Sequence, residues 1–167
     1  MPRLALVKPV AAFLDLIAHS EGTSTSKNTR DDGYDIIVSG VDGPHTFSDY
    51  SAHPFAAGRA PIIVRAAPAL LKSTASGRYQ ITLPTWRSLC ELNTLGTFSP
   101  ENQDLAAMDL LRQCHAYELI TASKIAAAIE ACCETWASFP GNLYHQGGRP
   151  MNWLLNHWQV FLGAQNV

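Results

Sequence analysis

The sequence predicts an α+β fold that is mainly helical and carries one small antiparallel β-sheet in its first half. Two observations carry this prediction. β-Branched and turn-forming residues are concentrated between about residues 34 and 47, whereas from Pro84 onward amphipathic stretches follow one another, separated by proline, glycine and serine. The length of 167 residues suits a single domain over 1–167, or a compact pair of lobes that share a cleft.

The first helix is predicted over residues 9–20. Its apolar side chains fall mainly on one side, Pro9 suits the first turn of a helix, and Gly22 is placed to end it. A polar loop is expected over residues 23–33. The segment 34–38 is rich in β-branched residues and, with the turn residues that follow it, predicts a small hairpin.

The rest of the chain is predicted to be loop and then helix. Proline and glycine make residues 51–61 a surface loop, while the apolar residues 62–72 are ambiguous. Four helices are then expected, over about residues 84–91, 100–117, 123–137 and 150–162. The side chains expected to be buried in the first and last of them are Trp86 and Leu89, and Trp153, Leu154, Trp158 and Phe161.

Composition argues against several classes of function. The formal net charge of −2 offers no basic patch for nucleic acid, and the histidines show no metal-binding spacing. No apolar stretch approaches the roughly 18 residues of a membrane span, and Asp15 interrupts the N-terminal one, so we expect neither a signal peptide nor stable membrane insertion. The cysteines lack a CxxC spacing and are expected to be reduced, mostly buried packing residues: Cys90, Cys114, Cys132 and Cys133.

Glu21 is the first candidate for chemistry. A carboxyl group at the C-terminal end of an apolar helix is partly desolvated and faces the negative end of the helix dipole, and both effects favour its neutral form. The resulting rise in pKa suits a general acid that works near neutral pH. The alternative is a solvated glutamate that merely ends the helix.

Two polar strings are candidates for binding a sugar. Residues 77–80 (GRYQ) combine a glycine, which lets the backbone approach a ligand, with a flat tyrosine ring and an amide suited to an N-acetyl group. Residues 46–51 (TFSDYS) follow the hairpin and are rich in hydroxyl groups. The first string could instead be a turn that enters a helix, and the second a polar loop.

Six strings, in their order and spacing, resemble the phage lambda endolysin family of lytic transglycosylases. They are AFLDLIAHSEGT (12–23), TRDDGYDIIVSG (29–40), FSDYSAHP (47–54), LKSTASGRYQI (71–81), FSPENQD (98–104) and IEACCETWASFPGNLYHQ (129–146). The resemblance covers about residues 11–146. The loop 55–67 is longer than the family pattern, and the chain after Gln146 matches it poorly.

The resemblance implies a lysozyme-like fold with an active-site cleft between two lobes and Glu21 as the catalytic acid. It places the substrate-binding residues on the matching strings, at Tyr34, Asp35, Ser48, Asp49, Tyr50, Arg78, Tyr79, Gln80, Tyr144 and Gln146. The loops around 51–61 and 139–149 are predicted to be rims of the cleft that move to admit a glycan.

The resemblance also implies the reaction. Glu21 would protonate the bond between N-acetylmuramic acid and N-acetylglucosamine and would then act as a base, without any cofactor, so that 1,6-anhydromuramic ends form. No second carboxylate has a compelling position, although Asp35 and Asp49 leave a hydrolytic lysozyme open. Two further classes compete with an enzyme: an inactive glycan-binding module and a virion structural protein.

The implied partner is the glycan strand of peptidoglycan, and the implied role is lysis of the host cell. The enzyme would be a monomer that stays in the host cytoplasm until a separate holin lets it reach the cell wall.

Overall fold

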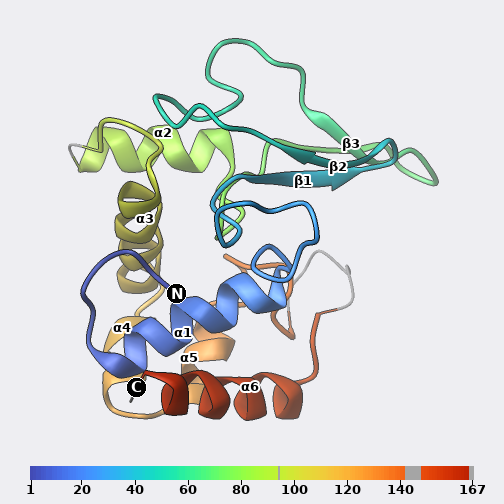
Figure 1. The fold of residues 1–167 in the computed structure, drawn as a ribbon. Coiled ribbons are helices and arrows are strands. Elements are labelled where there is room, and N and C mark those ends of the chain that lie inside the picture. The colour runs from blue at the N-terminus through green and yellow to red at the C-terminus, as the bar shows by residue number, and fades with distance from the viewer. Residues whose placement is uncertain (94, 142–147, 166–167) are drawn as a thin grey trace. The chain divides into compact units, whose positions relative to one another are not determined.

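The computed structural model describes residues 1–93, 95–141 and 148–165 (Figure 1). The chain forms two compact units. Unit 1 comprises Met1–Gly22 and Ala107–Val167, and unit 2 comprises Thr23–Ala106. The predicted α+β class is confirmed, because the described residues form six helices and two small antiparallel sheets.

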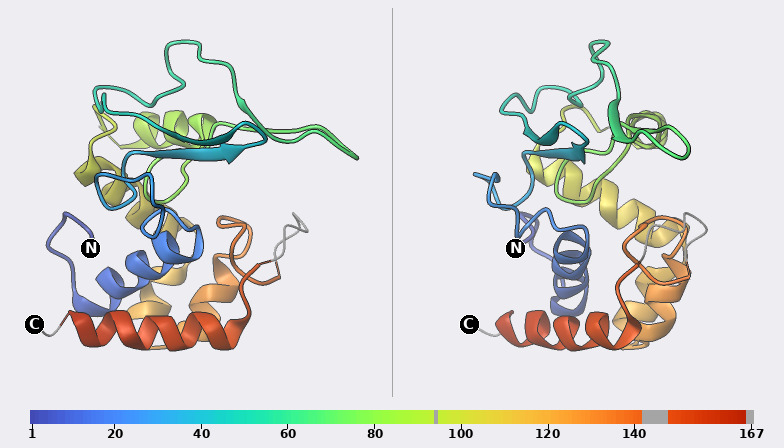
Figure 2. Two further views of the ribbon diagram at one scale, coloured as in Figure 1. Left: turned by 45° about the vertical axis from the view of Figure 1, so that its right-hand side comes forward. Right: turned by 90° about the vertical axis from the view of Figure 1, so that its right-hand side faces the viewer.

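Unit 1 is helical. It contains α1 (Lys8–Ser20), α4 (Ala116–Thr121), α5 (Ile125–Ala131), α6 (Met151–Ala164) and the end of α3 (Pro100–Gln113), which begins in unit 2. Helix α1 crosses α6, as Figure 2 shows from two directions, and it also contacts α4.

Helix α1 ends where the sequence predicts. Glu21 caps its C-terminus, and Gly22 follows with a φ of 76°, a left-handed conformation that glycine adopts at little cost. The expected one-sided pattern of burial is wrong, however, because every side chain from Val10 to Ala18 is buried. A helix that is buried all round belongs to the core rather than to the surface.

The C-terminal helix α6 supports the end of α1. Leu154 and Trp158 are buried as expected, but Trp153 and Phe161 are only half-buried. Trp153 stacks on His19 of α1, with ring centroids 5.2 Å apart. The aromatic helix thereby fixes the chain two residues before Glu21.

Two of the predicted helices are shorter than expected. The helix predicted to reach residue 117 ends at Gln113, because His115 has a positive φ of 58° and redirects the chain into α4. Ser123 likewise has a φ of 59°, and α5 ends at Ala131. Apolar periodicity continues across such breaks, so it does not locate them.

Unit 2 carries the strands and one helix of its own. These elements are β1 (Ile36–Gly40), β2 (Gly43–Thr46), β3 (Ile62–Arg65), β4 (Leu71–Ser73) and α2 (Leu83–Leu92). The predicted hairpin is the β1–β2 pair, in which Ile36 lies opposite Thr46. The ambiguous apolar segment 62–72 forms a second hairpin, β3–β4, and the amide of Val41 donates a 2.9 Å hydrogen bond to the carbonyl oxygen of Ile63.

Both hairpins of unit 2 contribute residues to its core. Ile37, Phe55 and Ile62 form a buried cluster. On α2 both Trp86 and Leu89 point inward as predicted. Residues 51–61 form no helix or strand, which confirms the predicted loop.

The four cysteines are unbridged, but only Cys132 is buried, so the expectation that most of them would be buried is wrong. Among the described residues, no helix is both long enough and apolar enough to cross a membrane.

Candidate active site

Glu21 is held in unit 1 by a serine that lies far away in the sequence. The hydroxyl of Ser138 donates a 2.7 Å hydrogen bond to Oε1 of Glu21, and the backbone amide of Ser138 donates to the same oxygen over 3.4 Å. Ser138 follows the buried Trp136 in the turns after α5, and Phe139 packs edge-on against Phe13 of α1. Core packing on both sides of Ser138 therefore fixes the position of its hydroxyl relative to α1.

Burial raises the pKa of the Glu21 carboxyl group above its ordinary value of 4.5. The hydrogen bonds from Ser138 and the charge of Arg149 act in the opposite direction, and burial outweighs them. Glu21 nevertheless keeps part of its surface exposed. A protonated carboxyl group that solvent can still reach is what a general acid requires.

Arg149 is connected to the same site. Its backbone amide donates a 2.7 Å hydrogen bond to the carbonyl oxygen of Ser138, and its guanidinium group lies 5.1 Å from the centre of the Trp153 ring. Helix α6 therefore contributes to the acid site, because its Trp153 packs against Arg149. The positive charge of Arg149 lowers the pKa of Glu21 and so favours its ionised form.

Ser20 extends the hydrogen-bond chain. Its hydroxyl lies 2.8 Å from that of Ser138 and 2.9 Å from the carbonyl oxygen of Ile17. With Glu21 ionised, Ser20 can donate to Ser138, which donates to Glu21. With Glu21 protonated, the direction can reverse, so that Glu21 donates to Ser138, Ser138 to Ser20, and Ser20 to Ile17. The arrangement can accommodate both protonation states, as a residue that acts first as acid and then as base requires.

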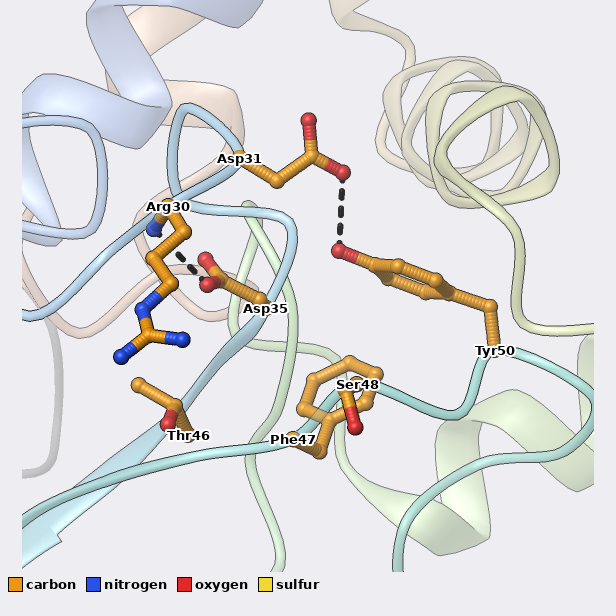
Figure 3. A pocket seen from close by; sticks show the side chains of 7 residues that line it. All are labelled: Arg30, Asp31, Asp35, Thr46, Phe47, Ser48 and Tyr50. Atoms are coloured by element: carbon orange, nitrogen blue, oxygen red, sulfur yellow. Dashed lines mark hydrogen bonds between the residues drawn. The ribbon is translucent and has the colours of Figure 1, made fainter.

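Unit 2 contains a pocket of about 380 Å³. Figure 3 shows the residues that line it, which are Arg30, Asp31, Asp35, Thr46, Phe47, Ser48 and Tyr50. Three of the predicted substrate-binding residues, Asp35, Ser48 and Tyr50, thus line one pocket. It combines an aromatic surface with hydroxyl and carboxylate groups, a lining suited to a polar ring such as a sugar.

Within this pocket, Asp35 has both carboxylate oxygens engaged. The hydroxyl of Thr29 donates to Oδ1 over 2.5 Å, and the backbone amide of Arg30 donates to Oδ2 over 2.8 Å (Figure 3 shows the second bond). The side chain is buried. Asp35 therefore closes the loop before β1, and each of its oxygens already accepts one hydrogen bond from the protein.

Two other acidic side chains in this region are also engaged. The hydroxyl of Tyr50 donates a 2.8 Å hydrogen bond to Asp31, which fixes its ring at the pocket wall (Figure 3). Asp49 is exposed, and hydrogen bonds from the side chain and the backbone amide of Ser51 lower its pKa. Asp49 stays ionised and stabilises a turn.

The predicted residues Tyr34, Arg78 and Tyr79 are fully buried in unit 2. The hydroxyls of Tyr34 and Tyr79 both donate to Oδ1 of Asp104, over 2.7 and 2.6 Å, and Arg78 lies against both rings. In this structure they present almost no surface to a sugar. Their packing supports the loop before β1 and the turn at residues 77–80.

The glycine of the GRYQ string makes a close approach, but to the protein itself. Gly77 has a φ of 75°, and a Cβ atom there would collide with the side-chain amide of Gln103. Gln103 in turn accepts a 2.9 Å hydrogen bond from the amide of Arg78. Gln80, the last residue of the string, is half-buried, and its side-chain amide donates to the carbonyl oxygen of Gly77 over 3.0 Å.

Tyr144 and Gln146 lie outside the described residues, as does most of the loop 139–149. Within the described ranges, no group of three histidine, cysteine, aspartate or glutamate residues is arranged to hold a metal ion.

The roles of Ser20, Ser138 and Arg149 were not predicted from the sequence. The string that contains Ser138 matched the family pattern, and this match was the one signal that pointed toward it.

Known proteins are similar to this chain along nearly its whole length. A family model described as Endolysin matches residues 11–165. The endolysin of Escherichia phage P2 is 43% identical over 166 residues, which are 98% of this chain and 99% of the relative. The endolysin of Escherichia phage lambda is 40% identical over 136 residues, or 81% of this chain and 79% of that relative.

The fold has solved counterparts. The structure of bacteriophage lambda lysozyme complexed with a chitohexasaccharide matches with a TM-score of 0.84 at 34% identity, over 95% of this chain and 96% of the other. A second structure of lysozyme from bacteriophage lambda matches with a TM-score of 0.73 at 32% identity, over 96% and 93%.

Proposed function

The chain belongs to the Endolysin family and is a peptidoglycan-degrading enzyme of lysozyme-like fold, and on this premise we propose that it is a lytic transglycosylase. It would cut the β-1,4 bond between N-acetylmuramic acid and N-acetylglucosamine, with Glu21 as its catalytic residue. The observation that carries the proposal is the environment of Glu21, a carboxyl group with a raised pKa at the end of a reversible hydroxyl chain.

In the first step Glu21 acts as a general acid. Its carboxyl proton moves to the glycosidic oxygen, the bond to C1 of the muramic sugar breaks, and the N-acetylglucosamine end leaves as an alcohol. The carboxylate that forms beside Ser138 is stabilised by the hydroxyl and amide of that residue. The positive charge of Arg149 stabilises it further.

In the second step the same carboxylate acts as a base. It takes the proton of the muramic C6 hydroxyl, whose oxygen attacks C1 and closes the 1,6-anhydro ring. Glu21 is protonated again at the end, and no water is consumed. The reversible chain through Ser138 and Ser20 fits such a cycle, because it has a donor pattern for each protonation state.

We propose that Asp35, Ser48, Asp49, Tyr50 and Gln80 bind the sugars, and that Tyr34, Arg78 and Tyr79 support them from within unit 2. The pocket beside Ser48 and Tyr50 supports this assignment, as does the chitohexasaccharide in the lambda lysozyme complex. Tyr144 and Gln146 remain proposed substrate-binding residues on the family resemblance alone.

Hydrolysis of the same bond is the nearest competing reaction. An ordinary glycosidase needs a second carboxylate to activate water or to attack C1. Both oxygens of Asp35 already accept hydrogen bonds, and Asp49 is held in a turn. These environments favour a mechanism with one carboxylate.

The cellular role follows from the family. We propose that the enzyme acts as a monomer on peptidoglycan strands and lyses the host after release from the cytoplasm, and that a separate holin provides the route.

Product analysis distinguishes the two reactions. Purified sacculi are digested to completion, and the muropeptides are treated with borohydride, which reduces ordinary reducing ends and leaves 1,6-anhydro ends unchanged. The proposal expects muramic ends that lack one water and resist reduction. Reducible muramic ends would assign the enzyme to the hydrolytic lysozymes.

A further inference from the structure

Two thiols of unit 1 lie in contact, one at the end of α3 and the other at the end of α5. The Sγ atoms of Cys114 and Cys132 are 3.1 Å apart. A disulfide bond has a length of about 2.05 Å, so an approach of roughly 1 Å would join them. We propose that Cys114 and Cys132 form a thiol pair that small-molecule disulfides oxidise to an intramolecular disulfide. The proposal concerns unit 1 alone and is independent of the reaction proposed above.

The backbone holds both sulfur atoms in place. Cys114 follows α3 directly, its amide donating a 3.1 Å hydrogen bond to the carbonyl oxygen of Leu110, and the left-handed His115 then turns the chain into α4. Cys132 caps the C-terminus of α5. Helices α4 and α5 lie between the two residues and pack on each other. The two sulfur atoms therefore meet where the chain enters the packed α4–α5 pair and where it leaves it.

The two thiols differ in a way that suits stepwise exchange. Cys114 is half-buried and is the more accessible of the two residues, whereas Cys132 is buried. The hydrogen bond between the thiols lowers the pKa of Cys114 to about 7. The same hydrogen bond and burial raise the pKa of Cys132. The thiolate, which is the nucleophile in exchange, therefore resides on the accessible partner.

The exchange is balanced in two steps. The Cys114 thiolate attacks one sulfur of an external disulfide, forms a mixed disulfide and expels one thiolate. Cys132 then gives up its proton, which ends on the first expelled thiolate, and attacks Sγ of Cys114, which releases the second external thiolate. One external disulfide is reduced to two thiols, and the two cysteines are oxidised to one disulfide.

The Cys114–Cys132 disulfide would be a covalent cross-link within unit 1. Cys114 and Cys132 are 18 positions apart, and a closed loop of that size restricts the unfolded chain. We expect oxidation to raise the thermal midpoint of the full chain by about 5 °C or more. The same enzyme would then be less stable under reducing conditions than under oxidising ones.

The test uses the full-length protein and oxidised glutathione. After incubation near pH 7 and quenching with iodoacetamide, intact mass and non-reducing peptide mapping locate every cysteine. The proposal expects one Cys114–Cys132 cross-link, alkylated Cys90 and Cys133, and a thermal midpoint that falls again on reduction.

Two variants serve as matched controls. Cys133→Ser should keep the cross-link, because it changes only the neighbour of Cys132. Cys132→Ser should abolish both the cross-link and the rise in thermal midpoint. A Cys114–Cys133 bond, a bond between two molecules, or a Cys132 that stays alkylatable after oxidation would each overturn the proposal.

Discussion

The end of α1 and the loop before β1 each present an acidic side chain, and the two carboxyl groups lie in opposite environments. Both hydrogen bonds that Ser138 donates to Glu21 end on Oε1, and burial still raises the pKa of this carboxyl group. Asp35 instead accepts a hydrogen bond on each oxygen, from Thr29 and from the amide of Arg30. The donors around the two carboxyl groups thus differ, since Ser138 reaches one oxygen of Glu21 whereas protein donors engage both oxygens of Asp35.

The largest effect is expected for Glu21→Gln. The amide is nearly isosteric and can still accept the hydrogen bond from Ser138, but it has no acidic proton to give and cannot take one back. Lysis of purified sacculi should fall by at least about 10³-fold, the upper part of the range for general acid–base catalysis. A variant that keeps more than a tenth of wild-type activity would remove Glu21 from the mechanism.

The same variant should also be more stable than the wild type at neutral pH. Since the folded-state pKa of Glu21 is raised, the native protein holds the proton more tightly than the unfolded chain, and wild-type stability falls as pH rises from 4.5 through the folded-state pKa. The Glu21→Gln variant does not lose stability in this way, because its side-chain amide does not ionise. The difference in unfolding free energy between variant and wild type should therefore grow over that pH interval and be independent of pH below it.

Asp104→Ala is expected to have the next largest effect, on stability. It removes the acceptor of two buried tyrosine hydroxyls, those of Tyr34 and Tyr79. Each buried hydroxyl without an acceptor costs about 1–3 kcal/mol, so urea unfolding should show a loss of about 3 kcal/mol. Tyr79→Phe is the matched control, and it should cost about 1 kcal/mol because one donor leaves while the acceptor stays. Equal effects of the two variants would argue against the shared acceptor.

Asp35→Asn should have a smaller effect and of a different kind from Glu21→Gln. The amide can accept from only one of the two donors that Asp35 binds, so the loop before β1 should lose about 1–2 kcal/mol of stability. Weaker substrate binding should raise KM, while kcat stays within about tenfold of wild type. A loss of kcat as severe as that of Glu21→Gln in a folded variant would make Asp35 a second catalytic carboxylate and favour hydrolysis.

The smallest effect is expected for Ser138→Ala. Removal of the hydroxyl deletes a hydrogen bond that lowers the pKa of Glu21, so the pKa should rise further and the alkaline limb of kcat/KM should move to higher pH. The loss of one positioned hydrogen bond should reduce kcat about 3–10-fold. Ser20→Ala leaves the hydrogen bond between Ser138 and Glu21 in place, so it should shift the alkaline limb of kcat/KM less. An unchanged pH profile in Ser138→Ala would show that the serine has only a structural role.

The parts of the molecule that the sequence could predict are those with local signals. Pro9, the apolar stretch after it and Gly22 located α1 and placed Glu21 at its end. The hairpin at β1 and β2 was also predictable, because its turn residues are adjacent in the chain. The segment 62–72 was ambiguous because its short apolar runs fit a buried strand as well as a helix.

What local sequence could not predict depends on long-range contacts. Ser138 is 117 positions from Glu21, and no local pattern distinguishes it from other turn serines. Tyr34 and Tyr79 were predicted to bind sugar, yet both are buried and their hydroxyls donate hydrogen bonds to Asp104. The sequence predicted that both tyrosines bind the substrate, and the fold instead gives their hydroxyls an aspartate of the same unit as acceptor.

The protonation of Glu21 can be measured directly. In protein labelled with ¹³C at the side-chain carboxyl carbon of glutamate, NMR spectra over a range of pH report its titration, and the spectrum of Glu21→Gln assigns the signal. We expect Glu21 to titrate above its ordinary value of 4.5 and its midpoint to rise again in Ser138→Ala. A Glu21 signal that titrates at or below 4.5 would contradict its role as the general acid.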